Sequence, residues 1–371
     1  MKILILTNSS GGLYNFRKEL LKEFLKTNEI IIGTPKGDFV PMLEKMGCTV
    51  LNTEFQRRGK NILKEFELFL LYMKIIKKIS PDVILTYTIK PTLYGGIVAR
   101  IYKKKCIANI TGLGSAVESK GILHKLLIYM YKVSFKNCYC VFFQNSANMK
   151  FFEERKIIGE NTKKYLIPGS GVNVKEHYFE EYPKTKEGED RFLFIGRIMK
   201  DKGIEEYLTT AKKIKQKHPL TSFEIIGHFD EDYSTYINQA QRDGFIKYLG
   251  EQSNVHFYIK NCNALILPSY HEGMSNVLLE AAATGRPVLA SDIPGCRETF
   301  EEGITGLGFQ PHNAEDLCEK IEKFINLTND EKRVMGKKAR EKIEKEFDRK
   351  IIVEKYVNEL KKVEREKNVT L

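Results

Sequence analysis

Residues 271–280 (HEGMSNVLLE) follow an apolar run at 263–268 (NALILP) and lead into a segment rich in alanine. The apolar run is typical of a buried parallel strand that ends in a turn. After the turn, residues 274–283 (MSNVLLEAAA) are predicted to form a helix, because they include good helix formers and no Gly or Pro. This order of strand, turn and helix predicts an α/β fold built on a parallel sheet.

The start of this predicted helix is a candidate anion site. Its first backbone N–H groups have no partner within the helix, and the helix dipole favours negative charge there. Glu272 precedes the helix, and Glu280 follows about two turns later. Such a site suits a sugar nucleotide, because the N–H groups can hold its diphosphate and a carboxylate can accept from its ribose hydroxyls. Two glutamates at this spacing also occur on solvated helix faces. The other residues of this candidate site are Gly273, Met274, Ser275 and Asn276.

The segment upstream repeats the pattern of strand, turn and helix. Residues 191–198 (RFLFIGRI) predict a strand, and residues 201–203 open the next helix. Arg197 and Lys202 lie five positions apart across this turn and can converge on one diphosphate, unless both are simply exposed cations. Further strands are predicted at 223–227, 246–249, 287–291 and 306–309.

A run of acidic residues follows the strand at 223–227. Asp230, Glu231 and Asp232 have the form of an Asp-x-Asp metal motif. They lie in a charged stretch with no His or Cys cluster, so a solvated loop is predicted and no metal site is expected.

The first half of the chain alternates short apolar runs with longer amphipathic runs, as in a doubly wound parallel sheet. Strands are predicted at 2–6, 29–32, 49–52, 82–86, 106–110 and 140–144, with helices notably at 14–25 and 61–79. Gly11 and Gly12 follow the first strand, where glycines allow close approach to a ligand or form a plain turn. Lys90 precedes Pro91 at a predicted helix start, either beside a ligand or as an ordinary surface lysine.

Length and composition fit a two-domain protein without a membrane span. The chain has 371 residues, of which 42% are hydrophobic and 29% charged. No apolar run approaches the ~18 residues that a membrane-spanning helix needs, and the first apolar run is too short for a signal peptide. Seven cysteines without the paired spacing of a metal site predict free thiols in a reducing cytoplasm.

Charge is distributed unevenly along the chain. Residues 1–170 contain 28 Lys and Arg against 13 Asp and Glu, a net charge of +15, whereas the remaining residues carry −3. This asymmetry predicts that the first half faces an anionic partner, such as a phospholipid surface, a lipid diphosphate or nucleic acid. Residues 121–137 combine apolar side chains with Lys125, Lys132 and Lys136, which is typical either of a helix that binds a membrane surface or of a core helix with a basic edge.

Taken together, these motifs resemble the retaining glycosyltransferases of family 4, and in particular the branch that assembles capsular polysaccharides and bacterial N-glycans. Glu272 and Glu280 match the paired-glutamate motif of that family, and Gly196, Arg197, Lys202 and Gly203 match its donor-phosphate signature residue by residue. The resemblance implies the GT-B fold, in which two Rossmann-like domains face each other across a cleft. It divides the chain into 1–175 on the acceptor side, 190–345 for the nucleotide sugar, and a terminal helix at 346–371. In the family this helix crosses back to the first domain, although the sequence alone equally allows a solvated terminal helix.

The resemblance also implies roles for single residues. Arg197 and Lys202 would stabilise the leaving diphosphate, Glu272 would contact the donor sugar, and Glu280 would hold the ribose. Residues 12–20 (GLYNFRKEL) and 86–96 (TYTIKPTLYGG) resemble segments of the same branch, which places Arg17 and Lys90 on the acceptor side and Gly11 and Gly12 near the cleft. Many relatives carry a histidine where this chain has Tyr87, so the base is not identified. The segments 111–115, 142–146 and 166–172 are similar to further landmarks of the family.

The implied reaction is transfer of a hexosyl or N-acetylhexosaminyl unit from a UDP-sugar, with retention of configuration and without a metal or other cofactor. The implied acceptor is a polyprenyl-diphosphate-linked saccharide, which places the protein in the cytoplasm, bound peripherally to the inner face of the cell membrane. A UDP-sugar 2-epimerase of the same fold remains an alternative. A nucleic-acid-binding protein is a weaker one, because the chain lacks a basic stripe with interleaved aromatic residues.

Overall fold

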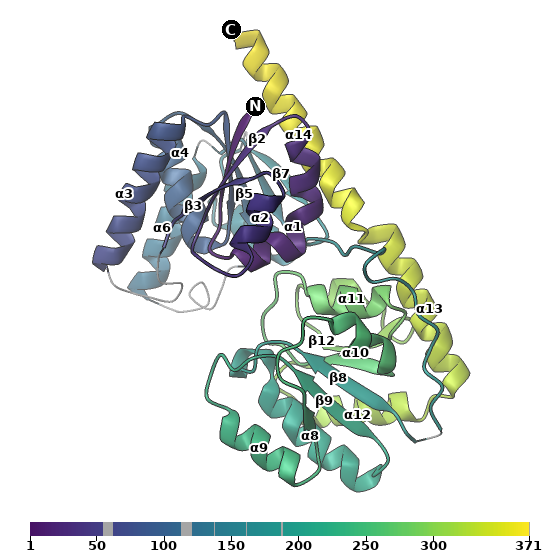
Figure 1. Ribbon diagram of the computed structural model, residues 1–371. Coiled ribbons are helices and arrows are strands. Elements are labelled where there is room, and N and C mark those ends of the chain that lie inside the picture. Colours follow the sequence, from purple (N-terminus) through teal and green to yellow (C-terminus); the bar gives the residue numbers. More distant parts are fainter. Residues whose placement is uncertain (55–61, 113–120, 137, 161, 187, 371) are drawn as a thin grey trace. The chain divides into compact units, whose positions relative to one another are not determined.

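The computed structural model describes residues 1–54, 62–112, 121–136, 138–160, 162–186 and 188–370 (Figure 1). The chain forms two compact units: residues 1–170 with 350–371, called unit 1, and residues 171–349, called unit 2. Residues 113–115 of the predicted motif at 111–115 lie outside the described residues, as do the predicted helix ends at Asn61 and Asn137. No helix in the described ranges is both long and apolar enough to cross a membrane.

Unit 1 contains a parallel sheet of seven strands in the order β3-β2-β1-β4-β5-β6-β7. Its strands are β1 (Lys2–Leu6), β2 (Glu29–Thr34), β3 (Thr49–Asn52), β4 (Val83–Tyr87), β5 (Lys105–Ile110), β6 (Cys140–Phe143) and β7 (Lys163–Leu166). Its helices are α1 (Ser10–Leu25), α2 (Val40–Lys45), α3 (Ile62–Ile79), η1 (Pro91–Gly95), α4 (Gly96–Ile101), α6 (Ile122–Phe135), α7 (Ser146–Glu154) and α14 (Arg349–Thr370).

Helices cover both faces of this sheet, because successive side chains of a strand point to opposite sides. Ile3 and Ile5 of β1 pack in a core with residues of α1, α2 and α14, whereas Leu4 and Leu6 pack in a second core with residues of α3, α4, α6 and α7. Figure 1 shows α3, α4 and α6 gathered on one side of the strands. Burial on both faces explains why the central strands read as continuous apolar runs in the sequence.

Unit 2 contains a parallel sheet of six strands in the order β10-β9-β8-β11-β12-β13. Its strands are β8 (Arg191–Ile195), β9 (Ser222–Ile226), β10 (Lys247–Tyr248), β11 (Ala264–Leu267), β12 (Val288–Ser291) and β13 (Gly306–Phe309). Its helices are η2 (Lys200–Lys202), α8 (Ile204–Lys217), α9 (Ser234–Arg242), α10 (Val255–Asn261), α11 (Asn276–Ala283), η3 (Arg297–Thr299), α12 (Ala314–Ile325) and α13 (Asn329–Glu346).

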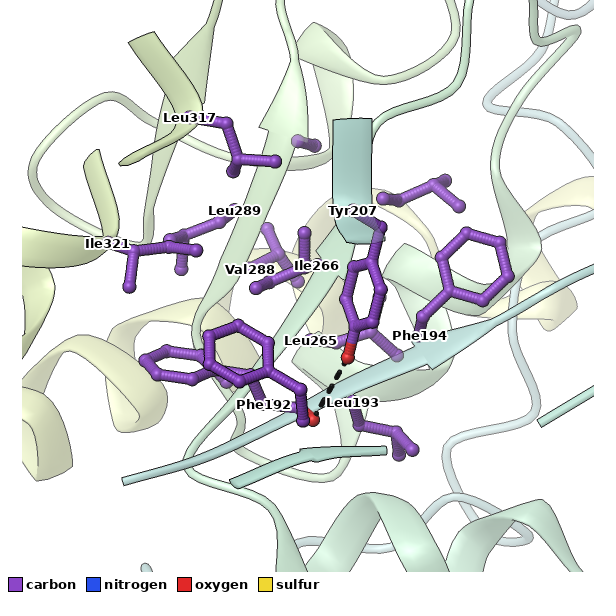
Figure 2. Packing of buried hydrophobic residues seen from close by; sticks show 14 of the residues in the cluster. Phe192, Leu193, Phe194, Tyr207, Leu265, Ile266, Val288, Leu289, Leu317 and Ile321 are labelled. Atoms are coloured by element: carbon purple, nitrogen blue, oxygen red, sulfur yellow. Dashed lines mark hydrogen bonds between the residues drawn. The ribbon is translucent and has the colours of Figure 1, made fainter. Parts of the chain in front are cut away.

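The core of unit 2 packs the sheet against residues of α8, α9, α10, α11 and α12, and Figure 2 shows part of it. Phe192 and Phe194 of β8 point into it together with Tyr207 of α8, and all three are fully buried. The Tyr207 hydroxyl donates to the carbonyls of Phe192 (3.3 Å) and Glu224 (2.9 Å). These bonds satisfy the one polar group that this tyrosine brings into the apolar interior.

Several boundaries differ from the sequence prediction. Helix α1 begins at Ser10, four residues earlier than predicted, because the Ser9 hydroxyl accepts from the Gly12 N–H over 2.9 Å and caps the helix. Strand β8 ends at Ile195 rather than at residue 198. Strand β7 was not predicted: it is an edge strand whose first two residues are exposed lysines, so it lacks an apolar run.

Candidate active site

The turn between β11 and α11 is fixed by close packing of two backbone segments. The Ser275 N–H donates to the Gly295 carbonyl over 2.8 Å, and Gly295 has a φ of +88°. A Cβ atom at Gly295 would lie 2.6 Å from the Glu272 carbonyl oxygen, so this approach requires glycine. The contact holds the residues before α11 against the loop that follows β12.

Helix α11 begins at Asn276, two residues later than predicted, and Ser275 is its N-cap. Gly273 and Met274 therefore lie in the preceding turn. The Met274 side chain is 7% exposed and packs with Leu279 and Ile343, so only its backbone faces the turn. This arrangement leaves backbone groups rather than the Met274 side chain to meet a ligand.

Two buried polar atoms at this helix start have no hydrogen-bond partner within the described part of the chain. They are the Ser275 hydroxyl, which makes no capping bond, and Oδ1 of Asn276. A buried polar atom left in this state costs about 1–3 kcal/mol. A ligand hydroxyl that donates to Oδ1 of Asn276, and a hydroxyl or phosphate oxygen that accepts from Ser275, would recover that cost.

Lys202 and Glu272 meet at the carboxyl end of β11. Nζ of Lys202 forms an ion pair with Oε1 of Glu272, and the two side chains are only 17% and 13% exposed. The Ser269 hydroxyl donates to the same carboxylate oxygen over 3.0 Å. Gly203 allows this proximity: its φ is +69°, and a Cβ atom there would lie 2.0 Å from the Pro268 carbonyl oxygen.

Arg197 and Asp230 form a second ion pair on the neighbouring strands. Nη1 of Arg197, beyond β8, contacts Oδ2 of Asp230, beyond β9, and the side chains are 30% and 24% exposed. Gly196 packs beside this pair: Gly227 has a φ of +150°, and a Cβ atom there would lie 1.8 Å from the Gly196 carbonyl oxygen. Because parallel strands end at one edge, Arg197 and Lys202 lie on the same edge of the sheet.

The Asp230 pair was missed by the sequence analysis, which predicted a solvated loop for the whole acidic run. Asp232 does belong to a local turn, where it accepts from the Ser234 N–H (3.4 Å) and hydroxyl (2.7 Å). In the residues that the structure describes, no group of three or more His, Cys, Asp and Glu side chains is arranged to hold a metal ion.

Glu280 lies inside α11, eight positions after Glu272, and is 16% exposed. Burial raises the pKa of its carboxyl group to about 7, with Arg349 favouring the charged form and Glu176 opposing it. A carboxyl group with a pKa in this range can act as a hydrogen-bond donor or acceptor near neutral pH.

The glycine pair of unit 1 lies inside the first turn of α1. Gly12 supplies the N–H that Ser9 caps, and a Cβ atom at Gly11 would lie 3.0 Å from the Phe39 ring. Neither glycine has a positive φ. Packing against Phe39 and helix capping thus account for both positions, besides any contact with a ligand.

Arg17 of α1 is buried, with 5% exposure. Its guanidinium carbon lies 5.4 Å from the centre of the Tyr87 ring and 5.8 Å from the Tyr356 ring, within the range of cation–π contacts. The Tyr356 hydroxyl donates to Oδ1 of Asn109. Burial raises the pKa of Tyr87, although the Arg17 charge acts against this, so the side chain is a neutral phenol near neutral pH.

Lys90 is the N-cap residue of η1, as its position before Pro91 predicted for a helix start. Its Nζ lies 2.5 Å from Oε1 of Glu65 in α3, and the side chains are 19% and 22% exposed. The Tyr94 hydroxyl donates to the other Glu65 oxygen over 2.8 Å. This pairing could not be predicted from a local pattern, because Glu65 lies 25 positions away in another helix.

Two family models match the chain: "Glycosyl transferases group 1" at residues 175–342 and "Glycosyl transferase 4-like" at residues 2–145. A curated relative from Campylobacter jejuni is 28% identical, over 96% of this chain and 97% of the relative. Its name is N,N'-diacetylbacillosaminyl-diphospho-undecaprenol alpha-1,3-N-acetylgalactosaminyltransferase. The capsular polysaccharide biosynthesis glycosyltransferase CapM of Staphylococcus aureus is also 28% identical, over 80% of this chain and 81% of the relative.

Solved structures show the same fold. A glycosyltransferase from Rickettsia africae superposes with a TM-score of 0.79 at 20% identity, covering 98% of each chain. HepE from Anabaena in complex with UDP superposes with a TM-score of 0.79 at 18% identity, covering 98% of this chain and 100% of that chain. These likenesses confirm the predicted α/β fold with two Rossmann-like domains.

Proposed function

The chain belongs to the family 4 glycosyltransferases of the GT-B fold, and we propose that it transfers a hexosyl or N-acetylhexosaminyl unit from a UDP-sugar to a polyprenyl-diphosphate-linked saccharide. The similarity to the Campylobacter jejuni transferase, which extends over nearly the whole of both chains, is the observation that carries this proposal. The name of that relative gives a transferred N-acetylhexosaminyl unit and a saccharide linked to undecaprenol through a diphosphate. The similarity to CapM supports a role in surface polysaccharide or glycan assembly.

In this proposal, Arg197 and Lys202 bind the donor diphosphate and stabilise the charge that develops when the glycosidic bond breaks. Each cation is paired with a carboxylate, Asp230 or Glu272, at the edge of the sheet. An ion pair of this kind holds a flexible side chain in place before the donor binds, so less reorganisation is needed during the reaction. Glu272, next to Lys202, contacts the donor sugar.

The helix start supplies the remaining donor contacts. The backbone at Gly273 and Met274 and the polar atoms of Ser275 and Asn276 hold phosphate or sugar hydroxyls. The two buried polar atoms without partners support this assignment, because they would otherwise be left unsatisfied. Glu280 accepts from the ribose hydroxyls.

The proposed chemistry retains the anomeric configuration and uses no metal. We assign no covalent nucleophile: the donor phosphate itself helps to deprotonate the acceptor on the face from which the leaving group departs. Tyr87 does not serve as the base in this scheme, since burial raises its pKa and disfavours the phenolate. Arg17, Lys90 and the glycines Gly11 and Gly12 are assigned to the acceptor side, in unit 1.

A coupled assay tests this function. The chain, a UDP-sugar and a short lipid-diphosphate saccharide should release UDP only when all three are present, and a chelator should leave the rate unchanged. UDP release that is lost with chelator and restored by Mn²⁺ or Mg²⁺ would contradict the metal-free scheme. Conversion of the donor to its epimer in the absence of any acceptor would instead favour the epimerase alternative.

We further propose that unit 1 binds the cytoplasmic face of an anionic membrane, where a lipid-linked acceptor is found. Two helices on one face of its sheet expose apolar side chains next to lysines. On α3, the exposed side chains of Leu63, Phe66 and Leu70 continue into Lys74 and Lys77 along one helical stripe. On α6, Leu126 (52%) and Tyr129 (65%) lie beside the exposed lysines Lys125, Lys132 and Lys136. Both helices pack on the same core, on the side of the sheet that faces away from α1.

Vesicle flotation should show this binding. Each basic residue near an anionic surface contributes about 1 kcal/mol, and the attraction fades beyond a Debye length of roughly 8 Å at physiological salt. The chain should therefore float with anionic vesicles, less so as salt increases, and the triple variant Lys125→Glu, Lys132→Glu, Lys136→Glu should remain in solution. Its activity on a short water-soluble acceptor should persist.

A matched control changes the same amount of charge in unit 2, where Lys323, Lys337 and Lys338 are exposed. Replacing these three by glutamate should leave flotation intact. If both triple variants lost flotation equally, net charge alone would explain the binding. If the chain floated equally with neutral and anionic vesicles, the basic residues of unit 1 would serve another partner. A salt-dependent gel shift with nucleic acid would point to that alternative.

A further inference from the structure

His177 lies beside Glu280 in unit 2, in a segment to which the function proposed above gives no role. Its Nε2 is 4.0 Å from Oε1 of Glu280, and the two side chains are 15% and 16% exposed. Glu280 belongs to α11, whereas His177 belongs to the turn at 173–177 that precedes β8. Contacts of this kind are often long before a substrate binds and tighten in the complex.

The backbone around His177 is held firmly in this position. The His177 N–H donates to the Asn173 carbonyl over 2.9 Å, which closes the turn. The Arg340 guanidinium, from α13, donates to the carbonyls of His177 (2.7 Å) and Ala283 (2.6 Å). Ala283 is the last residue of α11, so one arginine joins the turn to the helix that carries the carboxylate.

The imidazole ring of His177 also packs against a second histidine ring. The rings of His177 and His256 meet edge to face, with centres 5.8 Å apart and planes at 69°. His256 is fixed in turn by Thr284, whose hydroxyl lies 3.4 Å from Nδ1, and by Glu180, 3.6 Å from Nε2. Further charged groups that act on this network include Glu176 and Arg349 at Glu280, and Lys260 and Arg286 at His256.

The Glu280 carboxyl group can carry a proton near neutral pH. Because burial raises the pKa of Glu280 to about 7, its carboxyl group is protonated for a substantial part of the time near neutral pH. Nε2 of His177 and Oε1 of Glu280 are 4.0 Å apart, so they share this proton only once the contact shortens to hydrogen-bond length, as in the complex with a donor. The second carboxylate oxygen then keeps its lone pairs for a ligand.

We propose that His177 is a positioning residue for donor binding: it engages one oxygen of Glu280, so that the other oxygen accepts hydrogen bonds from the ribose hydroxyls of the nucleotide sugar. This inference rests on the proposed function, in which Glu280 meets the ribose. It adds a residue from outside the helix, joined to it through Arg340 and the ring of His256. His177 does not touch the reacting atoms, so its effect falls on donor affinity and not on the chemical step.

Calorimetric titration of the full chain tests this with three probes: UDP, 2′,3′-dideoxy-UDP and inorganic pyrophosphate. The unaltered chain should bind UDP about tenfold more tightly than the dideoxy analogue, since hydrogen bonds to a carboxylate are lost. His177→Phe, which keeps an aromatic ring against His256, should weaken UDP to the level of the dideoxy analogue and leave the other two affinities unchanged. His177→Gln, whose amide can still donate to Oε1, should lie between.

Kinetics give a second readout. His177→Phe should raise KM for the donor about tenfold with kcat nearly unchanged, as expected when binding is lost equally from ground and transition states. His218→Phe is the matched control: this histidine lies at the C-terminal end of α8, away from the carboxyl edge of the sheet, and should alter neither value.

Equal weakening of UDP and dideoxy-UDP by His177→Phe, or no weakening of either, would overturn the role of His177. A lack of preference for UDP over the dideoxy analogue in the unaltered chain would overturn the placement of the ribose, and this inference with it. Neither result bears on transfer itself, because the acceptor-dependent release of UDP is measured separately.

Discussion

A Lys202→Ala variant should turn over saturating UDP-sugar about 10²- to 10³-fold more slowly than the unaltered chain, the usual loss for one group that stabilises charge in the transition state. Lys202 is paired with Glu272 at the end of β11, where the proposed leaving diphosphate gains charge. Because that charge develops as the bond breaks, the loss should appear mainly in kcat. Steady-state rates at saturating donor and acceptor measure it.

The matched control is Lys200→Ala, since Lys200 lies in the same short helix and its side chain is exposed. Its turnover should stay close to that of the unaltered chain. The sequence left open that Lys202 is simply an exposed cation, but its pair with Glu272 is mostly buried, so its loss should also cost about 1 kcal/mol of stability. Near-normal turnover of Lys202→Ala, with its melting temperature checked, would contradict the assignment of this lysine.

The sequence predicted the fold well where a buried element appears as a continuous apolar run. Strands β1, β3 and β13 have the predicted bounds, because their apolar runs are framed by polar or turn-forming residues. The prediction failed where no apolar run is present: β7 is an exposed edge strand that starts with two lysines. Helix α1 was placed too late, because a serine cap before two glycines looks like a turn in the sequence.

The candidate site shows a similar division. Glu272, Glu280 and Lys202 could be assigned to the candidate site from the sequence, because each follows a strand within a recognisable local pattern. Asp230 and His177 were missed because their partners are distant in sequence: 33 positions separate Asp230 from Arg197. Strand order determines which charged side chains meet at the edge of a sheet. Strand order cannot be predicted from a local sequence pattern.

The largest stability effect should come from a buried ion pair outside the candidate site. Asp190, which precedes β8, and Lys332 of α13 are 2% and 3% exposed, with Nζ 2.8 and 2.9 Å from the two carboxylate oxygens. Burial raises the pKa of Asp190, although Lys332 favours its charged form. Lys332→Met leaves this carboxyl group buried without its cation and should lower the free energy of unfolding of unit 2 by about 3–5 kcal/mol. Hydrogen exchange of the β8 and β11 amides in the full chain reports that loss.

A double variant separates the two opposing contributions to this pair. Lys332→Met together with Asp190→Leu removes both charges, and because desolvating an ion pair offsets most of its attraction, protection of the β8 amides should return close to that of the unaltered chain. Lys217→Met is the surface control: Lys217 and its partner Glu322 are 66% and 33% exposed, so water already screens them and no measurable change is expected. A Lys332→Met variant as stable as this control would mean that Asp190 is satisfied by other groups once it is protonated. A double variant as unstable as Lys332→Met would mean that packing, not charge, fixes this part of unit 2.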